Sequence, residues 1–482
     1  MPPESPRRAA DRRSGLGALM SMISTVALGV LLASCASLPP RGGATAPATA
    51  ASAKALAQSV DVTGSRGKRL TAAQREQALQ RIAAQGKPSL VQHHLAVMAA
   101  AGDVDLYAGN DVKLLVDGPV TFAAMFAAAE AARDYILLES YIIEDSSVAQ
   151  RLAEVLLRKR AQGVQVYVIY DSLGSFGTSQ QYFDRLTNGG VGVCAFNPVN
   201  PLSRPGYWSI NHRDHRKVLV VDGQQAFMGG INVSEVYSSG SFSGGRARGD
   251  RKKDGWRDTQ IGLRGPVVAP LERMFRATWA SQGCKPQMAQ GAQRQSPVAG
   301  DKVVRIVESG PDEPESRIYS TLLSAIDAAQ TSVHLTMAYF APGPDMVAAL
   351  CDAARRGVDV TLILPSISDF GLILEAGRSY YSELLAAGVK VHELQDALLH
   401  AKTAVIDGVF STVGSSNLDW RSFVGNNEVN AIVLGEDFGA EMEAMFRRDL
   451  SVSTPITLQS WKDRPMHRRL KEWLARVFER WL

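Results

Sequence analysis

Cysteine is scarce in this chain of 482 residues, which holds four. Four cysteines exclude a disulfide-rich scaffold and an array of multi-cysteine zinc sites. Cys194 and Cys351 lie in apolar runs, which predicts small buried side chains. Apart from Cys35, which has a separate role, three cysteines remain. Because three is an odd number, at least one thiol stays free in an oxidising compartment. We assign no disulfide from the sequence.

A large excess of charge is also missing, because the formal net charge is +4 and residues 1–34 contribute two of those charges. Dedicated nucleic-acid binders usually show a large basic excess, so no nucleic-acid partner is expected. Hydrophobic residues at 45% and charged residues at 21% are globular values, which excludes a disordered or collagen-like chain. The length indicates two or more domains.

The first 34 residues have the layout of a secretory signal peptide, with four arginines before an apolar stretch from Leu16 to Ala33. The ending Leu32-Ala33-Ser34-Cys35 resembles a bacterial lipobox. This resemblance implies a lipidated Cys35 that anchors an extracytoplasmic protein to a membrane, and Ala36 after it implies the outer membrane. The alternative is an uncleaved single-span anchor, since the stretch is nearly long enough to cross a bilayer.

Short apolar strands alternate with helices from residue 112 onward. We expect strands over 112–116, 135–143 and 164–170, and helices over 121–132 and 147–162. This alternation predicts an α/β fold of mixed, mainly parallel sheets flanked by helices. Before it, a possible capping box at Thr71 and Gln74 predicts a helix over 71–84, and a second helix is expected over 90–101.

The same pattern begins again at residue 303, so the chain is a tandem duplication. Gly-Val-x-Val enters a strand at 163–166 and again at 357–360, and a second pair matches at 190–193 and 388–391. The predicted layout is a signal peptide, a tether with N-terminal helices, a first α/β unit, a second α/β unit and a basic tail: residues 1–34, 35–110, 111–300, 301–450 and 451–482.

Each copy carries the same five residue types at the same spacing. After a histidine, lysine follows by 2, aspartate by 7, glycine by 14 and asparagine by 17. The two sets are His215, Lys217, Asp222, Gly229 and Asn232, then His400, Lys402, Asp407, Gly414 and Asn417. A single histidine is usually a core or surface residue, but this pattern occurs twice at fixed offsets in a duplicated fold.

The spacing suits the chemistry of a phosphodiester. Residues two apart on a strand share a face, so each histidine points with its lysine, and facing copies would bring both pairs to one pocket. Lysines and asparagines would hold the phosphoryl oxygens, one imidazole would attack phosphorus, and the other would protonate the leaving oxygen. This chemistry requires no metal or cofactor. By parity Asp222 and Asp407 lie on the opposite strand face, where they buttress the fold more readily than they act in catalysis.

Over residues 112–450 the chain resembles the phospholipase D superfamily, named for its duplicated H-x-K-x4-D motif. The segments Tyr339–Pro342, Gly414–Asn417 and Asn426–Glu428 are most similar to bacterial cardiolipin synthases, although the signal-peptide start departs from members with two N-terminal transmembrane helices. The resemblance implies one shared active site, in which Asp258 and Glu428 orient the histidines.

The resemblance further implies that His215 is the nucleophile and His400 the general acid. The implied activity moves a phosphatidyl group from phosphatidylglycerol to a second lipid through a phosphohistidine. Water as the acceptor would instead make the protein a phospholipase D. A nuclease of the superfamily and a catalytically inactive lipid-binding lipoprotein are further alternatives, and the oligomeric state stays open.

Three residues are candidate substrate contacts, namely Arg246, Arg248 and Tyr339. The two arginines belong to a basic loop over 238–253, which either attracts anionic headgroups or is a solvated surface loop. His212 lacks a lysine two residues on, so we predict a loop-surface residue or a peripheral substrate contact.

The C-terminal tail has helical spacing of apolar residues and a basic excess. Its apolar positions are Leu470, Trp473, Leu474, Val477, Phe478 and Trp481. Residues 461–482 carry seven basic and three acidic side chains. Such a helix either lies on an anionic membrane surface or docks on the protein body.

Overall fold

The structure is a computed structural model that describes residues 60–84, 86–100, 105–200, 211–241, 255–288, 296–313 and 315–481. These residues all belong to one compact unit. The predictions made for Cys35, Arg246 and Arg248 lie outside the described residues. No helix in the described part of the chain combines the length and the apolarity needed to cross a bilayer.

The two copies share a core order of strands and helices, to which the first adds β6 and the second adds α12 and α13. The first comprises β2 (Asp105–Val116), α5 (Asp117–Ala131), β3 (Tyr135–Ser140), α6 (Ser147–Ala161), β4 (Gln165–Asp171), α7 (Gln180–Asn188), β5 (Gly192–Phe196), β6 (Arg213–Asp214), β7 (Lys217–Val221), β8 (Gln225–Gly229), β9 (Thr259–Arg264) and α8 (Val268–Ser281). The second comprises β10 (Lys302–Ser309), α9 (Arg317–Asp327), β11 (Ser332–Met337), α10 (Gly343–Arg355), β12 (Asp359–Pro365), α11 (Gly371–Arg378), α12 (Tyr381–Ala386), β13 (Lys390–Leu394), β14 (Lys402–Ile406), β15 (Phe410–Gly414), α13 (Trp420–Val424), β16 (Asn426–Leu434) and α14 (Glu436–Ser451).

The duplicated, helix-flanked α/β fold is confirmed, and the strand pairing refines it. Strands β3, β4 and β5 pair in parallel, as do β11, β12 and β13. The rest of each sheet is antiparallel, in the orders β3-β7-β8-β9-β2 and β11-β14-β15-β16-β10. The expectation of mainly parallel strands therefore holds only for the part of each copy where helices separate the strands.

A tight turn after each motif strand explains the antiparallel part. Asp222 and Gly223 have φ angles of 53° and 63°, and Asp407 and Gly408 have 55° and 67°. Consecutive left-handed residues form the turns that match the twist of a hairpin, and Asp-Gly is a preferred pair for them. The aspartate of each motif thus begins the return of the chain into an adjacent antiparallel strand.

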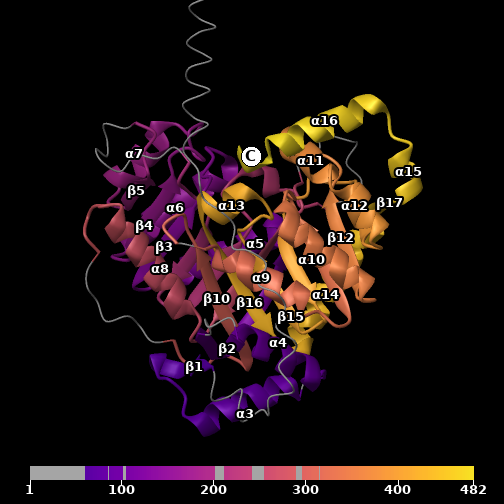
Figure 1. Cartoon of the computed structure of the whole chain (residues 1–482). Helices are drawn as coiled ribbons and strands as arrows, with labels where there is room; N and C mark the ends of the chain where they lie inside the picture. The colour runs from indigo at the N-terminus through magenta and orange to yellow at the C-terminus, as the bar shows by residue number, and fades with distance from the viewer. Residues whose placement is uncertain are drawn as a thin grey trace, which may run out of the picture. The chain divides into compact units, whose positions relative to one another are not determined.

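The two copies share a core and are joined by strand pairing, including that of β6 with β16. β2 pairs antiparallel with β10, which joins the sheets. Val218 and Met228 of the first copy belong to the same buried cluster as Val405, Val413 and Val429 of the second. In Figure 1 the first copy is magenta, the second orange, and β10 and β16 lie between them. The buried faces of the two sheets therefore pack as one body.

The N-terminal helices pack against this body. They are α3 (Ala72–Ala83) and α4 (Pro88–Ala100), preceded by β1 (Asp61–Thr63) and η1 (Ser65–Gly67). Thr71 and Gln74 form the predicted capping box. His94 of α4 is buried, and its Nε2–H donates to Asp407 Oδ2 at 2.9 Å. His94 is thus a core histidine that ties α4 to the second motif.

The C-terminal tail packs against the rest of the protein. Of the two predicted arrangements, docking on the protein body therefore holds for one face of its helix. The tail comprises β17 (Ser453–Ile456), α15 (Leu458–Lys462), α16 (Met466–Val477) and η4 (Glu479–Trp481). Ala475 is buried in a cluster with Ala341, Ile373 and Ala376. Glu472, also buried, pairs with Arg464 at 2.7 Å.

A disulfide joins Cys194 of β5 to Cys284, which follows α8, with the two Cα atoms 5.6 Å apart. The sequence assigned no disulfide, and the prediction of a small buried apolar side chain at Cys194 was wrong, because this cysteine is bonded and only partly buried. Cys351 is buried and free, as predicted for it. The two partners are 90 residues apart in the chain, and only the packing of α8 against the sheet brings them together.

Removing this disulfide is expected to destabilise the protein. In the chain-entropy model, closing a loop of 90 residues stabilises the fold by about 4–5 kcal/mol. The double variant Cys194→Ser/Cys284→Ser should lose a free energy of unfolding of that order in guanidinium titrations. Wild type in dithiothreitol should fall to the level of the variant. Equal stability of oxidised and reduced wild type would contradict the expectation.

Candidate active site

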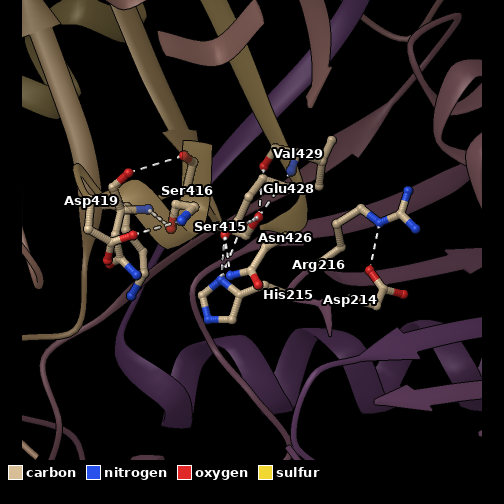
Figure 2. Close-up of polar contacts among 12 residues, drawn as sticks. Asp214, His215, Arg216, Ser415, Ser416, Asp419, Asn426, Glu428 and Val429 are labelled. Carbon is tan, nitrogen blue, oxygen red and sulfur yellow. Dashed lines mark hydrogen bonds and ion pairs between the residues drawn. The ribbon is translucent and has the colours of Figure 1, made fainter. Parts of the chain in front are cut away.

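His215 lies between β6 and β7, where the first copy contacts the second. β6 pairs in parallel with the start of β16, and the His215 backbone N–H donates to Asn427 O at 3.0 Å. This contact places the ring against Glu428, and His215 Nδ1 lies 2.9 and 3.1 Å from its two carboxylate oxygens. Figure 2 shows the ring turned towards Glu428. Nδ1–H therefore donates to Glu428, which leaves Nε2 with its lone pair.

Glu428 is itself held by neighbouring donors of the second copy. The Ser415 hydroxyl donates to Glu428 Oε2, and Asn426 Nδ2 lies 3.4 Å from Oε1 (Figure 2). Glu428 is fully buried. Its orientation is thus set before any substrate binds.

His400 has the reciprocal arrangement. Its backbone N–H donates to Arg257 O at 2.8 Å, and its Nδ1 lies 2.7 Å from Asp258 Oδ2. Asp258 belongs to the first copy and is fully buried. Each histidine is thus oriented by a carboxylate of the other copy. The sequence indicated both carboxylates but not this exchange.

The two histidines differ in their aromatic neighbours, none of which was predicted except Tyr339. The Tyr141 ring meets the His215 ring edge-on at 4.8 Å between centroids. Around His400, the Tyr237 hydroxyl lies 3.1 Å from Nδ1, and the rings of Trp256 and Tyr339 lie at 5.3 and 6.3 Å. Among the unpredicted aromatic residues, only Trp256 had a sign in the sequence, because it lies two residues before Asp258.

Both motif lysines are buried beside their histidines. Lys217 Nζ donates to His215 O, and Lys402 Nζ donates to His400 O. Lys217 Nζ also lies 5.0 Å from the centroid of the Tyr141 ring. Lys402 Nζ lies 3.1 Å from His400 Nδ1. Each lysine Nζ therefore lies beside the histidine of its own motif, as predicted for two residues on the same strand face.

The motif asparagines are nearly buried in loops after the hairpins. Asn232 Oδ1 accepts from the Ile142 backbone N–H at 3.1 Å, and the Asn232 side chain also hydrogen-bonds Tyr237. The Asn417 backbone N–H donates to Ser422 Oγ at 3.2 Å. The two residues follow β8 and β15 at equivalent places, so each copy brings one amide side chain to the end of its hairpin.

Burial and neighbouring cations keep the imidazoles neutral. The pKa of His215 is held well below its ordinary value by burial first, then by Lys217 and by Lys402 and His400 of the other copy. Burial and then Lys402 lower the pKa of His400, against the opposing effect of Asp258. Because groups of the second copy act on His215, both motifs share one electrostatic environment. At neutral pH a neutral imidazole at His215 is a competent nucleophile.

Burial also brings the pKa values of Lys217 and Glu428 close together. It lowers the pKa of Lys217 to about 7, with Glu428 acting against it. It raises the pKa of Glu428 to about 7, with Lys217 acting against it. The pKa of Lys402 is likewise lowered by burial. A bound phosphodiester anion would favour the charged lysines.

Asp222 and Asp407 have a structural role in the hairpins. The Asp222 carboxylate accepts three backbone N–H bonds at 2.8–2.9 Å, from residues Arg133, Asp134 and Tyr135. The Asp407 carboxylate accepts from residues Gln330, Thr331 and Ser332. Each aspartate thus ties the start of β3 or β11 to the motif hairpin, as the strand parity predicted.

His212 is not at the surface. The prediction of a loop-surface residue was wrong because His212 is buried, and its Nε2 lies 3.0 Å from Asn427 Oδ1 of the second copy. Arg216, also buried, pairs with Asp214 (Figure 2) and with Glu139, at 2.8 Å each. These contacts fix the backbone on both sides of His215. Across the described ranges, no group of three or more His, Cys, Asp or Glu side chains is placed to hold a metal ion.

A duplicated α/β fold with two buried His-Lys pairs, each histidine held by a carboxylate of the other copy, defines a phospholipase D-like protein. The family model described as the phospholipase D-like domain of cardiolipin synthase matches residues 125–239 and 322–450. The chain belongs to this family.

Two relatives and one solved structure agree with this assignment. Cardiolipin synthase A of Pseudomonas putida is 35% identical over 388 residues, which cover 80% of this chain and 77% of the relative. Cardiolipin synthase A of Pseudomonas aeruginosa LESB58 is 37% identical over 372 residues, covering 77% and 72%. The phosphatidylserine synthase of Haemophilus influenzae Rd KW20 shares the fold, with a TM-score of 0.58 at 11% identity over 77% of this chain and 95% of that one.

Proposed function

We propose that this protein is a phosphatidyltransferase that makes cardiolipin from phosphatidylglycerol. The observation that carries the proposal is the reciprocal pair of histidines, each with Nδ1 on a buried carboxylate of the other copy. This geometry leaves both Nε2 atoms for chemistry at one phosphodiester. The relatives named cardiolipin synthase A support the same substrate class.

In the first step His215 Nε2 attacks phosphorus of phosphatidylglycerol, and a P–N bond replaces the P–O bond to glycerol. Glu428 holds Nδ1–H and stabilises the imidazolium as charge develops. The anionic phosphodiester opposes the lysine charges that lower the pKa of His400, so it favours the protonated form that donates to the glycerol oxygen. Lys217, Lys402 and the motif asparagines stabilise the phosphoryl oxygens.

In the second step the hydroxyl of a second phosphatidylglycerol attacks the phosphohistidine. His400, now neutral, takes its proton, the P–N bond breaks, and cardiolipin leaves. Both steps use the same groups in reverse roles, so the site serves as acid and then as base. Water in place of the lipid hydroxyl would give phosphatidic acid.

Product analysis tests the proposal. The purified protein with phosphatidylglycerol vesicles should release one glycerol per cardiolipin formed, and His215→Ala should form neither. Phosphatidic acid as the sole product would show a hydrolase instead. Cleavage of DNA with no lipid turnover would show a nuclease, and no turnover of either substrate would leave a lipid-binding protein.

Tyr339 is proposed as a substrate contact beside His400. Its partly buried ring lies near His400, and its hydroxyl donates to Asp369 at 2.8 Å. Arg246 and Arg248 are proposed to attract the anionic headgroup. Their replacement by glutamine should raise KM for phosphatidylglycerol more than it lowers kcat.

We further propose an extracytoplasmic lipoprotein, anchored to the outer membrane through Cys35. The Cys194–Cys284 disulfide supports an oxidising compartment, because disulfides persist outside the cytoplasm and are rare inside it. Mass spectrometry of the mature protein is expected to find a diacylated or triacylated Cys35 at the N-terminus. Cys35→Ser should lose the lipid mass and stay unprocessed. An intact Met1–Ser34 segment on the wild-type membrane protein would contradict this.

A further inference from the structure

Two exposed phenylalanines occupy equivalent positions in the two copies. The strand registers establish the equivalence: Glu139 pairs with Val218 and Ile169, whereas Thr336 pairs with Thr403 and Ile363. Val218 and Thr403 each lie three residues after a motif histidine, so Ile169 and Ile363 correspond. Phe176 and Phe370 follow these isoleucines by seven residues each. Their side chains are 75% and 41% exposed.

Both phenylalanines are held next to the histidine sites. Ser175, before Phe176, accepts the Ile143 N–H and donates to Tyr141 O, and the Tyr141 ring contacts His215. Asp369, before Phe370, accepts the Tyr339 hydroxyl, and the Tyr339 ring lies near His400. The duplication therefore places an exposed phenylalanine next to a residue that hydrogen-bonds the tyrosine neighbouring each catalytic histidine.

The helix α16 presents an apolar face to solvent next to Phe370. Residues 3, 4, 7 or 8 apart share one side of a helix. The apolar side is 43–74% exposed and consists of Met466, Leu470, Trp473, Leu474, Val477 and the adjoining Phe478. The opposite side, with Glu472 and Ala475, is the buried one. The amphipathic helix thus packs on the protein through its small and paired residues.

This face is connected to the site through α11. Leu372 of α11 is 42% exposed, and Ile373 and Ala376 of α11 pack with Ala475 of α16. Tyr339 packs against the same cluster. In Figure 1, α16 lies across α11, and α7, which follows the Phe176 loop, lies towards the same upper edge.

The charges around α16 favour an anionic partner. Arg468, Arg469 and Lys471 are exposed on the helix. The acids of α16 and η4 themselves are buried, since Glu472 pairs with Arg464, and Glu479 accepts from Tyr380 and from the Gly343 N–H. Asp463 before the helix and Asp369 before Phe370 are exposed, so three exposed basic residues of the helix face two exposed acids around it. Apolar side chains at the centre of a face with basic side chains at its margin match a bilayer that carries anionic headgroups. A large exposed apolar patch on a soluble surface marks a binding site.

We propose that Phe176, Phe370, Leu372 and the apolar face of α16 form one docking surface for an anionic lipid bilayer. Docking seats both histidines at the headgroup level, so that phosphatidylglycerol reaches them without leaving the membrane. The inference rests on the proposed function only for this catalytic consequence. Insertion of the surface into the bilayer is tested separately from turnover.

Spin labels on the full chain in vesicles test insertion. Nitroxides are attached after Phe176→Cys, Phe370→Cys or Leu470→Cys, and Val298→Cys is the control. Val298 is 58% exposed and lies against Gly109 of β2, the strand labelled at the lower edge of Figure 1. In vesicles with phosphatidylglycerol, the three test labels should lie below the phosphate level by power saturation, and the control should stay in water.

Two results would overturn the proposal. The first is that all labels stay in water while the chain is bound to vesicles, which would show that the bilayer holds only another segment. The second is that the labels on α16 become immobilised by self-association in the absence of vesicles, which would assign the face to a second copy of the chain.

Turnover gives an independent readout of the same surface. The variants Leu470→Glu/Trp473→Glu and Phe176→Ser/Phe370→Ser should lower the rate on vesicles at least ~10-fold more than the rate on short-chain, monomeric phosphatidylglycerol. Val298→Glu should leave the ratio of the two rates unchanged. Equal losses on both substrates would contradict a docking role. If wild type makes no cardiolipin, the proposed function fails, while the spin labels still decide on the bilayer surface.

Discussion

His215→Ala is expected to abolish the covalent phosphatidyl adduct and to lower transfer at least ~10³-fold, because the variant lacks the imidazole assigned as nucleophile. The contact of Nδ1–H with Glu428 leaves the lone pair on Nε2, and the lowered pKa of His215 keeps the ring neutral, so Nε2 can act as the nucleophile. The measurement is peptide mapping of the trapped adduct together with the rate of cardiolipin formation from phosphatidylglycerol.

His400→Ala should slow turnover by a similar factor and still permit the adduct to form from a substrate with a good leaving group, which needs no protonation. His93→Ala is a matched control, since His93 lies outside the site with its Nε2 near Ala328 O. An adduct that maps to His400, or that survives in His215→Ala, would reverse the assignment of nucleophile and acid.

Glu428→Gln is expected to lower turnover by ~10²–10⁴, because an amide no longer stabilises the imidazolium and leaves the ring orientation and tautomer undetermined. Asp258→Asn should have the same effect on His400, because Asp258 Oδ2 lies 2.7 Å from His400 Nδ1. Steady-state rates should fall in kcat more than in KM, and ¹⁵N spectra of the histidine rings should show the altered tautomer.

Asp222→Asn provides the matched carboxylate control within the same motif. Asp222 accepts three backbone N–H bonds at the start of β3, so the variant should lose ~1–3 kcal/mol of unfolding free energy and keep most of its kcat. If Asp222→Asn loses as much kcat as Glu428→Gln at equal folded fraction, the division between orienting and structural carboxylates is wrong.

The local parts of the site were predictable because they depend on short spacing. Residues two apart on a strand share a face, which placed Lys217 with His215 and put Asp222 on the other side. The Asp-Gly pair after each motif strand is also a hairpin signal, which the prediction of mainly parallel strands left out. The antiparallel half of each sheet follows from that turn.

The sequence by itself determined the duplication and the two His-Lys pairs, because repeated spacing and strand parity are written along the chain, and the family resemblance pointed to Asp258 and Glu428. Only the tertiary structure decided that each carboxylate serves the histidine of the other copy, that Cys194 meets Cys284, and that the apolar side of α16 faces outward. The physical reason is the same in each case. These contacts join segments tens to hundreds of residues apart, and their partners are set by how sheets and helices pack, which a pattern along one chain does not specify.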